Sequence, residues 1–510
     1  MLRKIRLLTA IPVFVIITLL FLDFTGTLHK WFHFLAHIQF IPALLALNVG
    51  IVLFLIVLTW VFGRIYCSVI CPLGVFQDII ARISRLRKKL PYSYSPALSW
   101  LRYGVLAVFL VAFVAGLIAG VSYFLVPLLD PYSAYGRIAS NLFAPIWLWG
   151  NNLLAAWAER VDSYAFYRVD IWIKSTLVFV TAVVTFVIVA VLAWRNGRTY
   201  CNTICPVGTI LGFISRFSLF RIKIDADKCN HCTLCARNCK SSCINYLEYE
   251  VDNSRCVACG NCVGKCKRDA IGYKFVGMRI TQISTNIEKN PRESVQSASS
   301  ACNESRRNFL AVGALLASTA VLKAQEKADG GLAVIVDKKI PKRNTPIVPP
   351  GAAGLRNMTQ QCTACQLCVS VCPNQVLIPS SNLSSLMQPE LSYEKGFCRP
   401  ECVKCAEVCP TGAIKHIAKE EKSSIQIGQA VWIKQNCIVL TDKVKCGNCA
   451  RHCPAEAILM IPSEAGNDNS LQIPAVNTEK CIGCGACEYV CPSRPFSAIY
   501  VEGVERHKVV

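Results

Sequence analysis

The sequence predicts a membrane α-helical bundle of four spans, followed by a fifth signal-anchor-like helix and combined with small cysteine-rich α+β domains. The chain of 510 residues is 53% hydrophobic and 17% charged, which is too little charge for a soluble protein of this length. Lys and Arg number 54 against 32 Asp and Glu. Because this excess accompanies long apolar runs, it favours cytoplasm-facing membrane edges and no nucleic-acid partner. The 30 cysteines fall mostly into regularly spaced groups, which indicates metal ligands, because disulfide scaffolds are small secreted domains.

Four apolar stretches in the first 200 residues are each near the ~20 residues that cross a bilayer, and none contains an acidic residue. They are residues 5–22, 41–62, 101–129 and 173–194. The segments with excess positive charge are 1–6 (+3), 63–100 (+5) and 195–307 (+9). The segments 23–40 and 130–172 carry zero and −1. By the positive-inside rule, both ends of this four-helix unit lie in the cytoplasm.

Composition divides the whole chain into six regions. They are a four-helix membrane domain (1–200), a small cysteine-rich domain (225–275), a polar linker (276–305), a signal-like or transmembrane helix (306–326), a second linker (327–354) and a larger cysteine-rich domain (355–505). We expect the small cysteine-rich domain to be cytoplasmic, because it follows the fourth span.

Six groups of four cysteines carry the chemistry. Four have the Cys-x2-Cys-x2-Cys-x3-Cys spacing of bacterial ferredoxins, and two widen only the first gap. The groups are Cys229, Cys232, Cys235 and Cys239; Cys256, Cys259, Cys262 and Cys266; Cys362, Cys365, Cys368 and Cys372; Cys398, Cys402, Cys405 and Cys409; Cys437, Cys446, Cys449 and Cys453; Cys481, Cys484, Cys487 and Cys491. Zinc more often takes two separate pairs of ligands. We therefore expect six [4Fe–4S] clusters in bacterial ferredoxin-like domains.

In such a run three thiolates wrap one cubane and the fourth reaches a second cluster. The first domain is then expected to pair Cys229, Cys232, Cys235 with Cys266, and Cys239 with Cys256, Cys259, Cys262. Cys243 is an alternative to Cys239. In the second domain we expect nested pairing: Cys362, Cys365, Cys368 with Cys491; Cys372 with Cys481, Cys484, Cys487; Cys398, Cys402, Cys405 with Cys453; Cys409 with Cys437, Cys446, Cys449. Sequential pairing of neighbouring groups is the alternative that spacing leaves open.

A sequence repeat follows the second and fourth spans. Residues 63–74 read GRIYCSVICPLG and residues 197–208 read GRTYCNTICPVG. The two cysteines of each Cys-x3-Cys-Pro element are one helical turn apart, so their thiols face one direction. Duplication of a helix pair would bring Cys67 and Cys71 beside Cys201 and Cys205, as a further metal centre or a redox dithiol. The alternative is that these residues only shape the helix ends.

Three histidines form a stripe at the outer end of the first two spans. His29, His33 and His37 are spaced at i, i+4 and i+8, so they are candidates for accepting protons from a quinol, or they line an interfacial helix. The spans offer no facing histidines for a haem. The sequence also has no Cys-x2-Cys-His haem attachment and no Gly-x-Gly-x-x-Gly loop. We expect no haem, flavin or NAD cofactor.

Arg306 and Arg307 precede a mild apolar run in the sequence SRRNFL, which is similar to a twin-arginine export signal. The alternative is a basic flank on a fifth helix. Since a folded cluster domain requires an exporter of folded proteins, we expect the domain at 355–505 to lie in the periplasm.

These motifs resemble two known families. Residues 1–275 resemble the NapH family of membrane ferredoxin-type proteins in their four spans, two Cys-x3-Cys-Pro elements and two clusters. Residues 305–505 resemble the NapG/MauM family of exported ferredoxin-type proteins, with a twin-arginine leader and four clusters. The resemblance implies a quinol dehydrogenase module that feeds electrons to a periplasmic reductase, often nitrate reductase. NosR-type relatives and methylamine-dehydrogenase accessory proteins show that the same module can serve enzyme maturation.

From these features we expect a multi-pass protein of the bacterial inner membrane that takes electrons from the quinone pool. It would relay them through iron–sulfur clusters to a periplasmic redox enzyme or cytochrome, as an electron carrier rather than a stand-alone catalyst. One rival is a maturation or reactivation factor that reduces a metalloenzyme. A ferredoxin-driven pump is disfavoured because the spans lack a buried acidic relay. Clusters separated by ~30 Å of hydrocarbon need an intermediate carrier, for which the Cys-x3-Cys-Pro elements are candidates.

Overall fold

The computed structural model describes residues 2–88, 91–119, 125–163, 165–276, 328–329, 333–334, 337–464, 467 and 470–510. Contacts divide the chain into a larger unit (Met1–Met278, Ile340–Ser493, Ser497–Val510) and a smaller one (Arg279–Lys339, Arg494–Phe496). The described part of the smaller unit includes the antiparallel strands β5 (Ala328–Asp329) and β6 (Ala333–Val334). The twin-arginine sequence and the helix expected over 306–326 lie outside the described residues.

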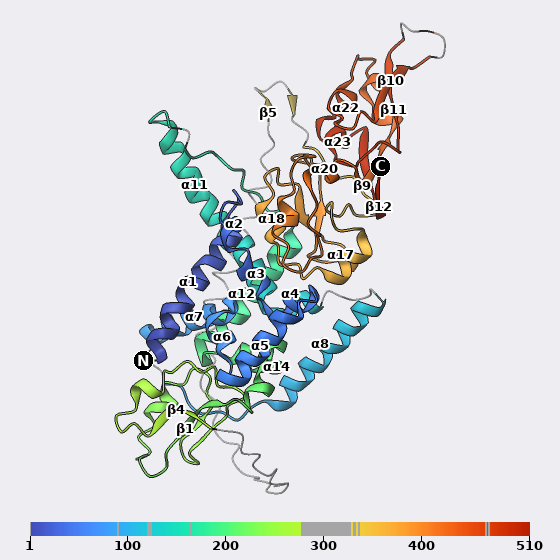
Figure 1. The fold of residues 1–510 in the computed structure, drawn as a ribbon. Helices are drawn as coiled ribbons and strands as arrows, with labels where there is room; N and C mark the ends of the chain where they lie inside the picture. The colour runs from blue at the N-terminus through green and yellow to red at the C-terminus, as the bar shows by residue number, and fades with distance from the viewer. Residues whose placement is uncertain are drawn as a thin grey trace, which may run out of the picture. The chain divides into compact units, whose positions relative to one another are not determined.

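In the described part of residues 2–215, the regular elements of the larger unit are all helices (Figure 1). They are α1 (Leu2–Leu22), α2 (His29–Phe32), α3 (Phe34–His37), α4 (Phe40–Leu45), α5 (Val49–Phe62), α6 (Ile65–Val69), α7 (Pro72–Lys88), α8 (Ser99–Ala119), α9 (Leu125–Leu129), α10 (Pro131–Ile138), the π-helix η1 (Ala139–Phe143), α11 (Ala144–Glu159), α12 (Thr176–Asn196), α13 (Thr199–Thr203) and α14 (Pro206–Ser215).

Three helices in the described part of the chain, α1, α8 and α12, are long and apolar enough to cross a membrane. The second expected span differs from the prediction, because it is broken into α4 and α5. Leu47 adopts a φ of 53° at the break, and the Asn48 side chain then caps α5 by accepting a hydrogen bond from the Ile51 amide. The 14 residues of α5 rise only about 21 Å.

The sequence repeat is also a structural repeat. In each copy an apolar helix ends at a glycine with positive φ (Gly63 or Gly197), a five-residue helix carries the first cysteine, and proline begins the next helix. Each copy packs against the other. The last helix of the first copy, α7, packs on α12 of the second copy, and the last helix of the second copy, α14, packs on α5 of the first. This packing places the two Cys-x3-Cys-Pro elements face to face.

The first cysteine-rich domain, residues 220–276, is small and consists of two antiparallel strand pairs and short helices. Its elements are β1 (Phe220–Ile224), α15 (Leu234–Arg237), β2 (Ile244–Asn245), β3 (Glu250–Val251), the 3-10 helix η2 (Val263–Lys265) and β4 (Ile271–Phe275). β1 pairs with β4 in the register Ile222 to Tyr273, and β2 pairs with β3.

The second cysteine-rich domain comprises residues 340–493 and 497–510. Its elements are α17 (Leu355–Gln361), α18 (Leu367–Val371), β7 (Leu377–Pro379), η3 (Leu383–Ser385), β8 (Pro389–Leu391), α19 (Lys404–Glu407), α20 (Lys419–Lys422), β9 (Ile425–Trp432), η4 (Lys434–Asn436), α21 (Ile438–Thr441), α22 (Asn448–Arg451), β10 (Ile458–Pro462), β11 (Gln472–Val476), α23 (Ala486–Val490) and β12 (Ile499–Val509). β7 pairs with β8, β10 with β11, and β9 with β12, all antiparallel.

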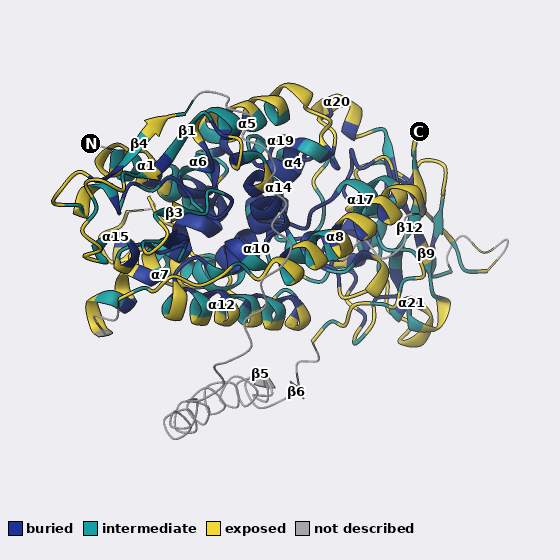
Figure 2. Ribbon diagram, turned by 90° about the horizontal axis from the view of Figure 1, so that it is seen from below, coloured by how far each residue is buried: buried dark blue, intermediate teal, exposed yellow. Residues whose placement is uncertain are grey.

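The short helix α10 is the most deeply buried element of the bundle, since all eight of its residues are buried (Figure 2). Asp130 caps it by accepting hydrogen bonds from the amides of Tyr132 and Ser133. Gly136 lies against the second cysteine-rich domain: a Cβ at this position would be 2.4 Å from the carbonyl oxygen of Cys365. The helix therefore touches a cysteine loop without an intervening side chain.

Candidate metal centres

The first cysteine-rich domain brings Cys239 to the second cysteine group, as the alternation predicts. Its thiol interacts electrostatically with those of Cys256, Cys259 and Cys262, and the four thiols line one small cavity. We call these four residues the Cys256 tetrad. Cys235 interacts with Cys229 and Cys232, the first three members of the other expected set.

Cys243 is a fifth thiol at the edge of the Cys256 tetrad. Its sulfur is 3.5 Å from that of Cys239, and it also contacts Cys256. Cys239, in contrast, interacts with all three cysteines of the second group. The geometry therefore favours Cys239 over Cys243 as the fourth ligand.

In the second cysteine-rich domain the expectation of nested pairing is wrong, and the sequential alternative holds. One cavity is lined by four thiols from the first two groups, those of Cys372, Cys398, Cys402 and Cys405. Another is lined by four thiols from the last two groups, those of Cys437, Cys446, Cys449 and Cys491. Electrostatic neighbours define the remaining two sets. The four sets are the Cys362 tetrad (Cys362, Cys365, Cys368, Cys409), the Cys398 tetrad (Cys372, Cys398, Cys402, Cys405), the Cys437 tetrad (Cys437, Cys446, Cys449, Cys491) and the Cys481 tetrad (Cys453, Cys481, Cys484, Cys487).

The reason for this pairing is that the domain consists of two consecutive two-cluster modules. Each module has its own β-hairpin, β7–β8 in the first and β10–β11 in the second. The fourth cysteine of each group crosses to its neighbour within the module, as in bacterial ferredoxins. Cys484 interacts with Cys398 across the modules, and Cys368 with Cys405 within the first, so the Cys362, Cys398 and Cys481 tetrads form a series.

The backbone around the thiols fits an anionic cluster. In four groups the second and fourth residues after the first cysteine have positive φ; these are His231 and Thr233, Ala258 and Gly260, Ala364 and Gln366, and Gly483 and Gly485. Such alternation turns successive amide groups to one side and forms an anion-binding nest. The Ala364 amide, for example, donates to the sulfur of Cys362 at 3.3 Å.

Burial disfavours the thiolate form of several of these cysteines. Burial raises the pKa of Cys365 and Cys484 to about 12 and that of Cys449 to about 11. Among the described residues no three His, Cys, Asp or Glu side chains converge on a single ion. A cubane does not require such convergence, because each of its thiolates binds a different iron. The cysteine spacing, with three ligands in one run and the fourth from the neighbouring group, is typical of cubanes, whereas zinc more often takes two separate pairs.

The two Cys-x3-Cys-Pro elements come together as one group of four buried thiols, the membrane tetrad (Cys67, Cys71, Cys201, Cys205). The Cys205 thiol interacts electrostatically with the other three. Each element depends on glycine for its own turn, because a Cβ at Gly74 or Gly208 would be 2.3 or 2.2 Å from the carbonyl oxygen of Cys67 or Cys201 in the same copy. A Cβ at Gly208 would also be 2.9 Å from Nη2 of Arg64 in the other copy. Convergence of the two pairs is thus confirmed, while the role of the four thiols stays a hypothesis.

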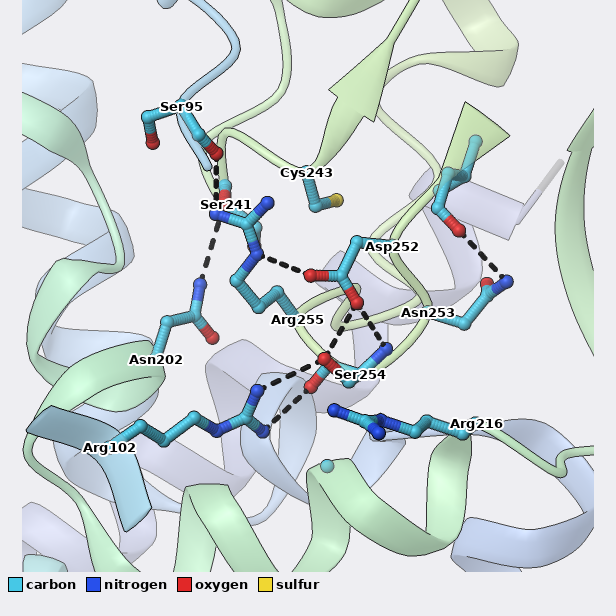
Figure 3. Close-up of polar contacts among 12 residues, drawn as sticks. Ser95, Arg102, Asn202, Arg216, Ser241, Cys243, Asp252, Asn253, Ser254 and Arg255 are labelled. Carbon is cyan, nitrogen blue, oxygen red and sulfur yellow. Dashed lines mark hydrogen bonds and ion pairs between the residues drawn. The ribbon is translucent and has the colours of Figure 1, made fainter. Parts of the chain in front are cut away.

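Polar contacts join the first cysteine-rich domain to the helices (Figure 3). Arg102 of α8 donates to the hydroxyl and carbonyl oxygens of Ser254 at 3.0 and 3.1 Å, and Asp252 accepts from the Ser254 hydroxyl. The partly buried carboxylate of Asp78 accepts hydrogen bonds from Arg198 and also pairs with Lys240. Although burial acts in the opposite direction, these cations hold the pKa of Asp78 below its usual range.

A cavity of about 490 Å³ lies between the helices and the second cysteine-rich domain, and we call it the Cys372 cavity. Its walls include Phe21, Phe24, Leu142, Leu148, Trp172 and Phe179. Within the described residues, the hydroxyl of Ser140 and the amide nitrogen of Gln366 are buried in this wall without a hydrogen-bond partner. Cys372 lines both this cavity and that of the Cys398 tetrad. No sequence signal pointed to this site, because its residues come from distant segments.

The histidine stripe does not line the Cys372 cavity. His29 is buried, with Nδ1 3.3 Å from the Asp23 carboxylate, and His33 Nδ1 is 3.1 Å from the carbonyl oxygen of His29. The rings of His33 and His37 meet edge to face. The side chains of His29 and His33 thus serve local hydrogen bonding, and a role for the three in quinol binding stays a prediction.

Comparison with known proteins supports the presence of 4Fe–4S domains in this chain. A 4Fe-4S binding domain model matches residues 44–91 and again residues 178–225, a second such model matches 249–272, and a 4Fe-4S dicluster domain model matches 444–494. The first model thus matches both copies of the repeat.

Several curated proteins are similar to the chain. The methylamine utilization ferredoxin-type protein MauM of Methylophilus methylotrophus is 32% identical over 200 residues, which are 37% of this chain and 82% of the relative. MauM of Methylobacillus flagellatus is 32% identical over 152 residues, 29% of this chain and 64% of the relative. The ferredoxin-type protein NapG of Escherichia coli is 30% identical over 151 residues, 28% of this chain and 64% of the relative. No solved structure matches.

Proposed function

Because the chain belongs to the NapG/MauM family of ferredoxin-type proteins and carries 4Fe–4S domains, we propose that it oxidises quinol in a bacterial cytoplasmic membrane. The electrons then pass through six [4Fe–4S] clusters to a periplasmic redox enzyme or cytochrome. The Cys372 cavity carries this proposal, since it combines apolar walls, unpartnered polar groups and a cluster ligand.

In this proposal α1, the broken pair α4–α5, α8 and α12 cross the membrane, and the N-terminal half is NapH-like. The outward apolar side chains support contact with lipid: Leu53 and Phe54 of α5 are each 58% exposed, and Val111 of α8 is 69% exposed. The Cys372 cavity then lies at the outer end of the bundle, next to the exported domain.

The residues of the cavity suit a quinol headgroup. The ring would lie among the aromatic walls, the Gln366 amide would donate to one ring oxygen, and the Ser140 hydroxyl would bond to a ring oxygen as well. Oxidation of the quinol releases two protons and two electrons. The cluster that the Cys398 tetrad would hold supplies a one-electron acceptor directly behind Cys372.

The test uses the full-length holoprotein in proteoliposomes, with anaerobic addition of menadiol. We expect menadiol to bleach the iron–sulfur absorption of the wild-type protein. Gln366→Leu should slow this bleaching about fivefold to tenfold, because one hydrogen bond to the bound ring is lost. Gln360→Leu, on the neighbouring α17 and outside the cavity, is the matched control and should leave the rate unchanged.

Reduction by dithionite checks that the clusters of each variant are intact. If dithionite bleaches the wild-type clusters and menadiol does not, quinol oxidation is excluded. That outcome would favour the second reading, in which the protein supplies electrons for the maturation or reactivation of a metalloenzyme.

A further inference from the structure

The membrane tetrad is a set of grouped cysteines that the six clusters leave unused, and every one of its sulfurs receives a hydrogen bond. The donors are Arg64 Nη2 to Cys67 (3.8 Å), Gln77 Nε2 to Cys201 (3.3 Å), the Gly208 amide to Cys205 (3.3 Å) and the Gly74 amide to Cys71. Neutral thiols gain little from four donors, whereas thiolates bound to a metal are stabilised by them. The donors therefore indicate that the four sulfurs carry negative charge.

Two fully buried arginines flank the tetrad and indicate the same charge. Arg64 of the first copy donates to the carbonyl oxygen of Cys201 at 3.2 Å, and Arg198 of the second copy donates to that of Cys67 at 2.6 Å. Each arginine therefore forms a hydrogen bond with the other copy of the repeat. Arg198 is neutralised by Asp78. Within the described part of the chain Arg64 forms no ion pair, and its other acceptors are the side-chain oxygen of Asn202 and the carbonyl oxygen of Ser254.

A fully buried guanidinium without a counter-charge is costly. A disulfide or a neutral dithiol would leave Arg64 with no anion among its hydrogen-bond partners, and all four cysteines are free thiols here. An iron–sulfur cluster bound by four thiolates carries a net charge of about −2 and would supply the missing anion. The family model that matches both copies of the repeat agrees, because Cys67 and Cys71 are the only cysteines in residues 44–91.

Electrostatic interactions also connect the membrane tetrad with both cysteine-rich domains. On one side Arg64 interacts with Cys201 of the membrane tetrad and with Cys256 of the Cys256 tetrad. On the other side Tyr66 interacts with Cys71 and with Asp130. Asp130 in turn interacts with Cys365 of the Cys362 tetrad.

We propose that the membrane tetrad holds an iron–sulfur cluster of its own, which transfers electrons between the Cys256 tetrad and the Cys362 tetrad. The step is a one-electron exchange in which one cluster is reduced as its neighbour is oxidised, with no bond made or broken. The inference goes beyond the proposed function and does not depend on quinol, because it concerns the connection between the two cysteine-rich domains.

The test measures iron and acid-labile sulfide in the full chain, purified anaerobically. We expect Cys67→Ser combined with Cys201→Ser to lower the iron content by about two to four atoms per chain, according to whether the cluster has two or four irons. Cys302→Ser removes a cysteine outside all the groups and is the matched control. Unchanged iron in the double variant overturns the proposal, and so does stoichiometric zinc or a disulfide between these cysteines in the wild-type protein.

A second variant decides the question even if the first does not accumulate. Gln77→Leu keeps the buried volume and removes only the donor to Cys201. We expect unchanged iron content and a shift of one paramagnetic resonance signal to lower midpoint potential in a dithionite titration, because the more negative, reduced cluster loses a hydrogen bond. If every signal keeps its potential, the membrane tetrad holds no cluster and the proposal fails.

Discussion

The two cysteine-rich domains share a motif and differ in how they attach to the helices. The first has a core that is mostly its own, including Ile222, Ile244 and Ile271, and it docks through charged contacts at Asp78 and Ser254. The second is continuous with the core of the bundle. Among the described residues no ion pair joins the second domain to the helices.

This difference indicates different tasks. Buried charge pairs fix orientation but are lost together when one partner is removed, whereas apolar packing is spread over many side chains. The first domain is held in one orientation toward the membrane tetrad by Arg64 and Lys240. The second is an integral part of the bundle and forms one wall of the Cys372 cavity. Three experiments test or sharpen this comparison.

The largest effect is expected from removing a cluster ligand in the second cysteine-rich domain. Each module of this domain is expected to bind two clusters, as is the whole first cysteine-rich domain. Cys491→Ser should lose one cluster, about four irons per chain, and destabilise the module that contains it. Adding Cys437→Ser should cause no further loss, because both cysteines belong to the Cys437 tetrad. Iron analysis of the single and double variants is the measurement. Loss of a second cluster in the double variant would instead support nested pairing, in which Cys491 and Cys437 bind different clusters.

The second-largest effect is expected at the contacts that attach the two cysteine-rich domains to the helices. Asp78→Asn should weaken docking of the first domain by about 3–5 kcal/mol, because Arg198 and Lys240 lose their shared carboxylate. Met387→Ala, in the apolar contact with Val178, should cost about 2–4 kcal/mol and affect the second domain. Hydrogen–deuterium exchange of each domain is the measurement.

Asp225→Asn is the matched control for the charged contact. Asp225 pairs with Lys228 and Lys274 at 3.9 and 3.8 Å near the surface, and such pairs contribute little. The contrast between docking through ion pairs and docking without them fails if Asp78→Asn raises exchange equally in both domains.

The smallest effect is expected from Cys243, a fifth thiol for which we find no counterpart in the tetrads of the second domain. Cys243→Ser should shift the midpoint potential of the Cys256 tetrad by about 30 mV, because its hydrogen bond to Cys239 or Cys256 changes strength. Iron content should stay the same. A loss of about four irons would instead identify Cys243 as a ligand.

The sequence was sufficient to predict what depends on local spacing. Cys239 reaches the second cysteine group because three residues separate it from Cys235, and the repeated sequences predicted the convergence of Cys67 and Cys201. Nested pairing failed because spacing carries no information on which neighbouring groups pack together. The second span is broken at Leu47 because Asn48 can begin a new helix, a competing local preference that hydropathy does not register.

Other parts of the site could not be predicted because they depend on contacts between distant segments. Ser140 and Gln366 are 226 residues apart, and neither belongs to a motif. Arg64 and Arg198 were visible in the repeat, each directly after a glycine, but their exchange across the two copies requires the packing of α7 on α12. A rule that buried arginines beside paired cysteines indicate an anionic centre would have found them.

The shared position of Cys372 has a consequence for how this protein can change. The same residue lines the Cys372 cavity and the cavity of the Cys398 tetrad. In the proposed function it therefore bounds the space for the quinol and binds the cluster that takes the electrons. A substitution that reshapes the Cys372 cavity near this residue would also disturb the cluster of the Cys398 tetrad. The preference for one quinol and the potential of the cluster that accepts its electrons therefore cannot vary independently there. If the cavity binds quinol, variation in the choice of quinol would then fall to wall residues outside the cysteine groups, such as Leu148 and Phe179.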